Sequence, residues 1–399
     1  MKNNNKFPAK FLTLFALAAT EAISSCKKEE QLPVDVKLQA SAQKALNKNS
    51  VSYVPLSDSA YQAVSIGRRA FYLEKALPTG YVKNGTVDYT KYVQQAISKN
   101  TEVIFPAFPI LVNKNGLMVR SDRTLTFLKG SEIRLKASND HSYRIFNIAN
   151  ASNVVLNNPV IIGDRTEHIG QGGRAGVGLG IYSSTNIVIN NPQIFNCWGD
   201  GIYIGRSSSK SHNKNIQISN AYVSDAGRNG MSVITVDGLK VNKGYFANSG
   251  LTGLDIEGNY GDEEIKNITL ENITTDHNSY NGLTIALSRT FDKRDKSVGE
   301  IKVVNHRDIA SRNYSFKSTV SAPAAGMGKI GGIITLVNPT WENPGSGRPN
   351  FNSISQKDLK VKIQKPSVFA GSRKLTDVEC LKLIKLNIKK NTEVEVSFN

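Results

Sequence analysis

A short alternating motif that ends in Asn recurs through the middle of this 399-residue chain. Seven copies align, namely VVLNN, IVINN, IQISN, LKVNK, ITLEN, IKVVN and ITLVN. Their last positions are separated by 33, 29, 23, 29, 33 and 33 residues and are Asn158, Asn191, Asn220, Lys243, Asn272, Asn305 and Asn338. A period of this length is typical of a solenoid, in which each repeat buries its apolar face against the next.

The alternation predicts stacked strands, because a helix would need apolar residues three and four positions apart. Asn tolerates tight turns, and its side-chain amide can both donate and accept hydrogen bonds. Coils stacked about 4.8 Å apart would join these amides in a ladder inside a bend. We therefore expect Asn191 and Asn220 to be buried neighbours within hydrogen-bond reach.

A second row of strands opens with Gly and keeps the same register. The segments are GIYIG at 201–205, GMSVI at 230–234, GLDIE at 253–257 and GLTIA at 282–286. Period-two alternation points the second residue of each segment inward and the third outward. The outward residues are Tyr203, Ser232, Asp255 and Thr284.

The segments before the repeat predict how the solenoid begins. DYTKYVQQAI at 88–97 starts with Asp88, a good N-cap residue, and has apolar residues at helical spacing. Residues 101–112 and 116–135 alternate like strands and are broken by turn residues.

Taken together, the helix at 88–97, the strand TEVIFPAF and the coil repeats resemble the pectin-lyase-like superfamily over about residues 85–345. The resemblance implies an all-β fold, a single-stranded right-handed parallel β-helix with an N-terminal capping helix. We expect residues 51–399 to form this domain, with a β-rich C-terminal end.

The N-terminus predicts export. Lys2, Lys6 and Lys10 precede an apolar run at 11–19 that is too short to span a bilayer. ISSC at 23–26 resembles the bacterial lipobox, in which Cys26 would become the lipidated first mature residue, and KKEE resembles the export tag of Bacteroidota surface lipoproteins. We expect a signal peptide at 1–25, a polar tether at 26–50, and a lipoprotein of the outer membrane, exposed at the cell surface.

The chain is basic and poor in cysteine. Its formal net charge is +17, and about +15 would remain without residues 1–25. Such a charge favours nucleic acid, an anionic membrane or an acidic polysaccharide as partner, unless the basic residues form a dispersed, solvated surface. Export argues against nucleic acid, and no second apolar stretch could cross a membrane, which leaves the lipid as the membrane contact. Cys197 and Cys380 alone favour neither a disulfide scaffold nor a Cys-based metal site.

The acidic pair Asp255 and Glu257 is the strongest candidate for catalysis, because both carboxylates should face solvent on one strand. Their Cα atoms would lie about 6.5–7 Å apart, and their carboxyl groups about 5 to 9 Å apart, which spans retaining and inverting glycosidase geometries. One could act as general acid and the other as base or nucleophile. Asp200, about 10 Å away across two coils, could complete the set. Carbohydrate-active members of the superfamily keep their active sites on this same strand.

Four other residues are candidates for substrate binding, and each has an ordinary structural alternative. Arg228 could bind substrate or pair with the acids as a structural ion pair. Tyr203 and Trp198 could stack on sugar faces or serve only in packing. His277 lies at the exit of a third strand and could be an ordinary turn residue.

Calcium is the one cofactor that the sequence suggests. Asp262, Glu263 and Glu264 form an acidic loop that could bind Ca²⁺ or could be a solvated turn. The NTD, Gly-His-Gly and Arg-Ile-Lys strings of polygalacturonases are absent, and the acids match pectate lyases only loosely. The GxxxxGK[ST], HExxH, GxSxG and CxxC strings are absent as well.

The fold resemblance and the acids favour a surface-anchored protein that binds an extended acidic polysaccharide and cleaves it, as a glycoside hydrolase or a polysaccharide lyase. The alternative is a non-catalytic glycan-binding or adhesive β-helix that uses the same groove. The missing motifs favour binding, whereas the clustered acids favour chemistry. The assignment to carbohydrate comes from the fold resemblance.

Overall fold

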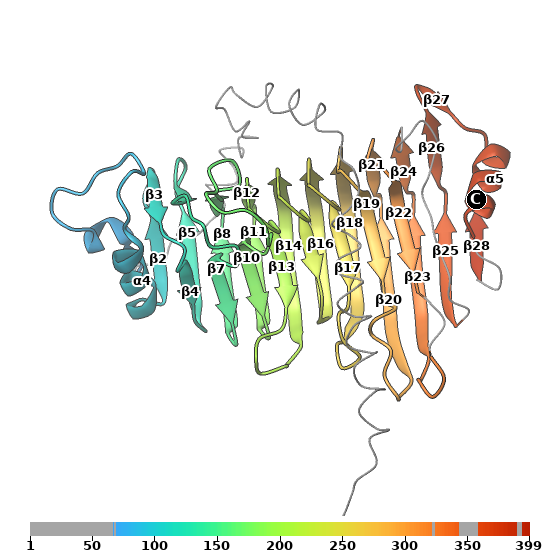
Figure 1. Ribbon diagram of the computed structural model, residues 1–399, viewed down its shortest axis with the longest axis horizontal. Coiled ribbons are helices and arrows are strands. Elements are labelled where there is room, and N and C mark those ends of the chain that lie inside the picture. Colours follow the sequence, from blue (N-terminus) through green and yellow to red (C-terminus); the bar gives the residue numbers. More distant parts are fainter. Residues whose placement is uncertain (1–66, 68, 321–323, 343–357, 389–392) are drawn as a thin grey trace, which may run out of the picture. The chain divides into compact units, whose positions relative to one another are not determined.

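The repeats stack as a parallel β-solenoid in the computed structural model, which describes residues 67, 69–320, 324–342, 358–388 and 393–399 (Figure 1). All of them belong to the unit Val54–Asn399. The predicted parallel β-helix is thus confirmed. Cys26, the signal peptide at 1–25 and the tether at 26–50 lie outside the described residues.

Two sheets make up the described part of the solenoid. The eight-stranded sheet contains β4 (Leu117–Val119), β7 (Arg144–Ala149), β10 (Val177–Tyr182), β13 (Ile202–Gly205), β15 (Met231–Val233), β17 (Leu254–Glu257), β19 (Asn281–Ala286) and β22 (Tyr314–Thr319). The twenty-stranded sheet contains β1 (Phe71–Tyr72), β2 (Glu102–Phe105), β3 (Pro109–Val112), β5 (Arg123–Phe127), β6 (Glu132–Leu135), β8 (Ser152–Asn157), β9 (Val160–Ile162), β11 (Thr185–Asn190), β12 (Gln193–Phe195), β14 (Asn213–Ser224), β16 (Val236–Ala247), β18 (Ile265–Asp276), β20 (Lys296–Val304), β21 (Arg307–Ile309), β23 (Ile330–Val337), β24 (Thr340–Glu342), β25 (Leu359–Gln364), β26 (Ser367–Ala370), β27 (Arg373–Lys374) and β28 (Val394–Ser397).

The inward residues of the repeat form a continuous apolar core. The first residues of six of the seven aligned motifs pair in sequence order and are 0–2% exposed: Ile187, Ile216, Leu239, Ile268, Ile301 and Ile334. Each such side chain contributes about 1.5–3 kcal/mol when it is fully buried. The alignment of the motifs therefore fixes the stacking register.

The Asn ladder exists, but the predicted pair within it is not buried: Asn158 is 1% exposed, whereas Asn191 and Asn220 reach the surface. The Asn220 Nδ2 donates to Asn191 Oδ1 at 2.7 Å, as predicted, yet Asn220 is exposed and Asn191 is half-buried. Both residues have left-handed backbones, with φ of 53° and 52°, which Asn adopts more readily than most residues. Where Lys243 interrupts the row, the neighbouring Asn242 accepts from Asn272 at 3.2 Å. The ladder thus holds the outer side of each corner.

The predicted capping helix is α4, Thr90–Lys99, which begins two residues later than expected. The N-cap residue is Tyr89 rather than the predicted Asp88, and no side chain caps the helix from that position. Asp88, one residue earlier, accepts at its Oδ1 from the Thr90 N–H at 2.9 Å. The helix packs against β2, β4 and the 3-10 helix η1 (Leu73–Ala76), next to the first coils (Figure 1).

The C-terminal end contains a helix that was not expected. The helix α5, Asp377–Leu386, begins with a capping box in which Thr376 and Glu379 satisfy each other's backbone N–H groups. After it, β28 adds a strand in parallel to β25. The described C-terminal end therefore contains a helix in addition to its strands.

One coil interrupts the apolar core with a buried polar cluster. Thr275 and Asp308 occupy the interior row between Phe246 and Trp341, and all four are 0% exposed. The Thr275 Oγ1 and the Ser311 Oγ each donate to Asp308 Oδ1 at 2.6 Å.

A buried histidine extends this cluster. The His306 Nε2 lies 3.0 Å from Thr275 Oγ1 and therefore donates to it, since the hydroxyl proton of Thr275 points at Asp308. Burial lowers the pKa of His306 to about 3, so the ring is neutral at ordinary pH and carries its proton on Nε2.

In the described part of the chain, no helix is long and apolar enough to span a membrane. Cys197 and Cys380 are free, buried thiols.

Candidate functional site

The outward residues of the eight-stranded sheet align in one row. Tyr203 pairs with Ser232, Ser232 with Asp255, Asp255 with Thr284, and Thr284 with Lys317. We call these five residues the outer row. The inward residues between them, such as Leu254 and Ile256, are fully buried. The predicted register of the acids is therefore correct.

The predicted exposure of the acids is wrong. Asp255 is only 9% exposed and Asp200 only 2% exposed, whereas Glu257 is partly exposed. The physical reason is the turn before β15, where the side chain of Asn229 lies between the two aspartates and bonds to one of them. The row faces outward, but its neighbours in adjacent coils cover the two aspartates.

A hydrogen-bonded network joins the two buried aspartates. The Asn229 Nδ2 donates to Asp255 Oδ2 at 3.2 Å and to Ser232 Oγ at 3.0 Å. The Ser232 Oγ in turn donates to Asp200 Oδ2 at 3.2 Å, and the Asn229 N–H donates to Asp200 Oδ1 at 3.0 Å. The Asp255 Oδ1 is buried and has no partner among the described residues.

Burial and neighbouring charge favour the protonated form of Asp255. Burial raises the pKa of Asp255 well above its usual range, and Glu257 and Asp200 raise it further by repulsion. Arg228 and Lys317 act in the opposite direction. Burial also raises the pKa of Asp200, mainly against the attraction of Arg228.

Arg228 and Tyr203 lie beside the acids, as predicted. The Arg228 Nε lies 3.7 Å from Asp200 Oδ1, and its side chain remains 37% exposed. The nearby Asp200 raises the pKa of Arg228, and Glu257, Tyr203 and Asp255 act in the same direction. The Tyr203 ring lies 5.6 Å from that of Tyr182, in a tilted arrangement, and burial raises the pKa of Tyr203.

Trp198 belongs to a different cluster, under the loop that joins β9 to β10. Its ring stacks on His168 at 4.0 Å, and its Nε1 donates to the Gly173 carbonyl at 3.1 Å. The His168 Nδ1 contacts Asp164 Oδ2 at 2.9 Å, and the Tyr143 hydroxyl donates to Asp164 Oδ1 at 2.6 Å. One face of the indole is therefore covered and cannot stack on a sugar.

His277 lies at the corner after β18 and does not join the outer row. Its φ is 47°, at the position where the other coils place Asn196, Asp225, Asn248 and Ala310, all with positive φ. Its Nδ1 contacts Asp276, and its side chain is 64% exposed.

The acidic loop after β17 is folded around an arginine. Arg206 Nη1 lies 2.8 Å from Asp262 Oδ1, and Arg206 Nε lies 3.2 Å from Glu263 Oε1. The guanidinium also lies 4.6 Å from the Tyr260 ring centroid. Glu264 pairs instead with Lys266 at 2.9 Å. Each carboxylate of the loop is thus paired with a cationic side chain, which does not fit a Ca²⁺ site. The described residues also contain no group of three or more His, Cys, Asp or Glu arranged to hold a metal.

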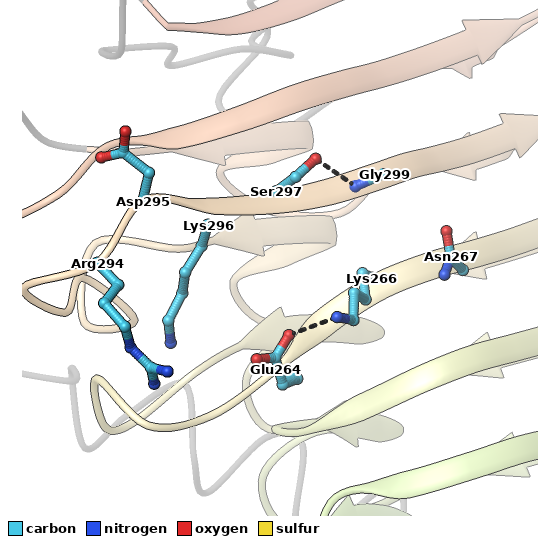
Figure 2. A pocket seen from close by; sticks show the side chains of 8 residues that line it. All are labelled: Glu264, Lys266, Asn267, Arg294, Asp295, Lys296, Ser297 and Gly299. Atoms are coloured by element: carbon cyan, nitrogen blue, oxygen red, sulfur yellow. Dashed lines mark hydrogen bonds and ion pairs between the residues drawn. The ribbon is translucent and has the colours of Figure 1, made fainter.

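A charged cavity of about 350 Å³ lies at the corner where β18 and β20 begin (Figure 2). It is lined by Glu264, Lys266, Asn267, Arg294, Asp295, Lys296, Ser297 and Gly299. Figure 2 shows the side chains of Lys266, Lys296 and Arg294 on this corner, and Lys266 is paired with Glu264. None of the outer-row residues lines the cavity.

Sequence reasoning missed Lys317 and the bridging role of Asn229. The strand of Lys317, YSFKST, has Ser315 where the aligned strands have Gly, so it was not recognised as a member of the Gly-opened row. Asn229 contacts Asp200 and Asp255, which lie on two other coils, and no sequence pattern indicates these contacts.

Comparison with known proteins gives a fold and no family. No family model matches the chain, and no curated protein matches it either. Among solved structures, the tailspike of E. coli bacteriophage HK620 matches with a TM-score of 0.57 at 13% identity, over 75% of this chain and 57% of that one.

Two further solved structures match similarly. The endo-xylogalacturonan hydrolase of Aspergillus tubingensis matches with a TM-score of 0.51 at 13% identity, over 82% of this chain and 91% of that one. The Streptococcus pneumoniae surface adhesin PfbA matches with a TM-score of 0.50 at 14% identity, over 75% and 88%. Some similar structures are longer, and the chain spans 63% and 57% of two of them. At these identities the likeness establishes a shared parallel β-helix fold.

Proposed function

We propose that this protein is a glycoside hydrolase that binds an extended acidic polysaccharide along the outer row. The observation that carries the proposal is Asp255. It combines burial, a raised pKa and an oxygen, Oδ1, with no partner among the described residues. A protonated carboxyl group in that state is a hydrogen-bond donor without an acceptor, as a general acid is before substrate binds.

The proposed chemistry uses Asp255 and Glu257 in different roles. Asp255 donates its proton to the glycosidic oxygen as the bond to the sugar breaks. Glu257, the next outward residue on β17 and less buried, takes the proton of an attacking water or attacks as nucleophile. Asp200 holds Asn229 and Arg228 in place around Asp255. The configuration of the released sugar distinguishes the two roles of Glu257.

The raised pKa of Asp255 favours hydrolysis over a lyase reaction, because a lyase must abstract a proton from the sugar ring with an unprotonated base, which a protonated carboxyl group cannot provide. The shared fold supports a glycan substrate by analogy: the HK620 tailspike has been solved in complex with a pentasaccharide, and another similar structure is a xylogalacturonan hydrolase. We further propose export and lipid anchoring through Cys26.

Non-catalytic glycan adhesion is the second candidate. Asp200 is 2% exposed and has hydrogen bonds on both oxygens, as expected for a structural carboxylate. The similarity to an adhesin is compatible with this alternative.

The test is a substrate panel with three variants. We expect Asp255→Asn and Glu257→Gln to lower turnover of a cleaved glycan about a hundred- to ten-thousand-fold. Asp237→Asn, on the other sheet, is the matched control and should leave turnover unchanged. Products with unsaturated ends would identify a lyase, and binding without turnover by the parent protein would favour adhesion.

A further inference from the structure

Lys317 extends the outer row beyond the acids. It lies on β22, pairs with Thr284, and is two coils from Asp255. At the spacing of paired strands, this places the Lys317 Cα about 10 Å from that of Asp255 along the row. A polymer that reaches Asp255 along this direction also passes Lys317.

Two tyrosines hold the Lys317 ammonium group. Its Nζ lies 5.7 Å from the Tyr280 ring centroid and 5.8 Å from that of Tyr314, within the range of cation–π attraction. Tyr314 begins β22, and Tyr280 comes from the turn before β19 and is 38% exposed. Two segments from different coils therefore meet at this ammonium.

The charge of Lys317 is not neutralised within the described part of the chain. No carboxylate there lies within ion-pair distance of its Nζ, whereas Arg228 has Asp200 and Arg206 has Asp262 and Glu263. An ammonium held by rings but lacking an anion is suited to a carboxylate, because a charge-assisted hydrogen bond is about twice as strong as a neutral one. The exposed tyrosine ring adds an apolar surface for the C–H face of a sugar.

We propose that Lys317, Tyr280 and Tyr314 form a subsite for a carboxylate-bearing sugar residue, two coils from the scissile bond. The proposal rests on the proposed function of the outer row. Such a subsite would also link the binding of substrate to catalysis at Asp255. The positive charge of Lys317 lowers the pKa of Asp255, so a bound carboxylate would cancel this effect and favour the protonated acid.

The experiment measures binding to matched pairs of oligosaccharides. Hexasaccharides of galacturonate, alginate and hyaluronan are each titrated beside the same sugar with its carboxyl groups reduced to alcohols. The protein carries Asp255→Asn to prevent turnover, with and without Lys317→Met, which keeps the apolar stem of the side chain. Lys302→Met on β20, an exposed lysine of the other sheet, is the control for lost charge.

We expect Lys317→Met to weaken binding of the carboxylated sugar about ten- to a hundredfold, as for the loss of one hydrogen bond to a charged group. Binding of the sugar whose carboxyl groups are reduced to alcohols should not change. Lys302→Met should change neither. Equal weakening of both sugars, or no change, overturns the subsite while the proposed function stands. A parent protein that binds none of the sugars overturns both proposals. Preferential binding of dextran sulfate would overturn the assignment to a carboxylate.

Discussion

Replacing Asp308 with Asn removes a carboxyl group from the solenoid core while keeping its shape. Asp308 is 0% exposed, and burial raises its pKa to about 6 from the ordinary value of 3.8, despite hydroxyl donors from Ser311 and Thr275. The folded protein therefore holds this proton more tightly than the unfolded chain. The stabilisation that this tighter proton binding gives the folded state is complete below pH 3.8 and is lost as the pH rises through about 6.

The magnitude follows from the shift. A difference of about two pKa units between the folded and unfolded states corresponds to about 3 kcal/mol. A small part of this is already lost at pH 4, just above the unfolded pKa, so the protein should lose about 2.5 kcal/mol of its free energy of unfolding between pH 4 and pH 8 through Asp308 alone. The amide side chain of the Asp308→Asn variant does not titrate, so the variant should not show this loss of stability.

The titration of His306 changes the stability in the opposite direction to that of Asp308, so the two contributions must be separated. Burial lowers the pKa of His306 to about 3 from 6.5, so its contribution is present above pH 6.5 and is lost as the pH falls toward 3. Parent and variant share this contribution. It cancels in the difference between their free energies of unfolding, although either curve alone would mix the two effects.

The assay is urea unfolding of the full chain, followed by circular dichroism, at several pH values from 4 to 8. The free energy of unfolding of Asp308→Asn minus that of the parent should rise by about 2.5 kcal/mol between pH 4 and pH 8, whatever the difference is at pH 4. Asp237→Asn, at a half-exposed position, should give a flat difference. If the free energies of unfolding of the parent and of Asp308→Asn changed in parallel with pH, the prediction that Asp308 is buried with a raised pKa would be wrong.

Three other predictions follow from the same structure. Asn191→Ala should lower the free energy of unfolding by about 2–3 kcal/mol, because it breaks two ladder bonds and strains a left-handed backbone. The control is Asn84→Ala, at an exposed position outside the ladder, and a melting temperature of Asn191→Ala no lower than that of the control would contradict this prediction. Glu257→Gln should reduce turnover without lowering the melting temperature, and a large stability loss would instead make Glu257 structural. Cys26→Ser should release the protein from membranes, and a parent protein already free in the medium would disprove the anchor.

The sequence alone determined the solenoid and its register. The spacing of the aligned motifs placed Ile187, Ile216 and Leu239 in one interior row, because strand alternation is a local property and similar repeats stack with their apolar residues aligned. The same logic correctly put Asp255 in line with Ser232 and Thr284. It also foresaw the amide ladder, because Asn is suited to both the turn and the bond.

Only the tertiary structure decided what surrounds those side chains. Asp255 is buried because Asn229, from another coil, covers it, and one face of Trp198 is covered by His168, from a loop thirty residues earlier. Lys317 entered the outer row once the strand pairing was known, since Ser315 conceals the repeat at that coil. Burial, charge and hydrogen bonding sum over neighbours that are distant in sequence, so periodicity fixes the direction of a side chain but not its environment.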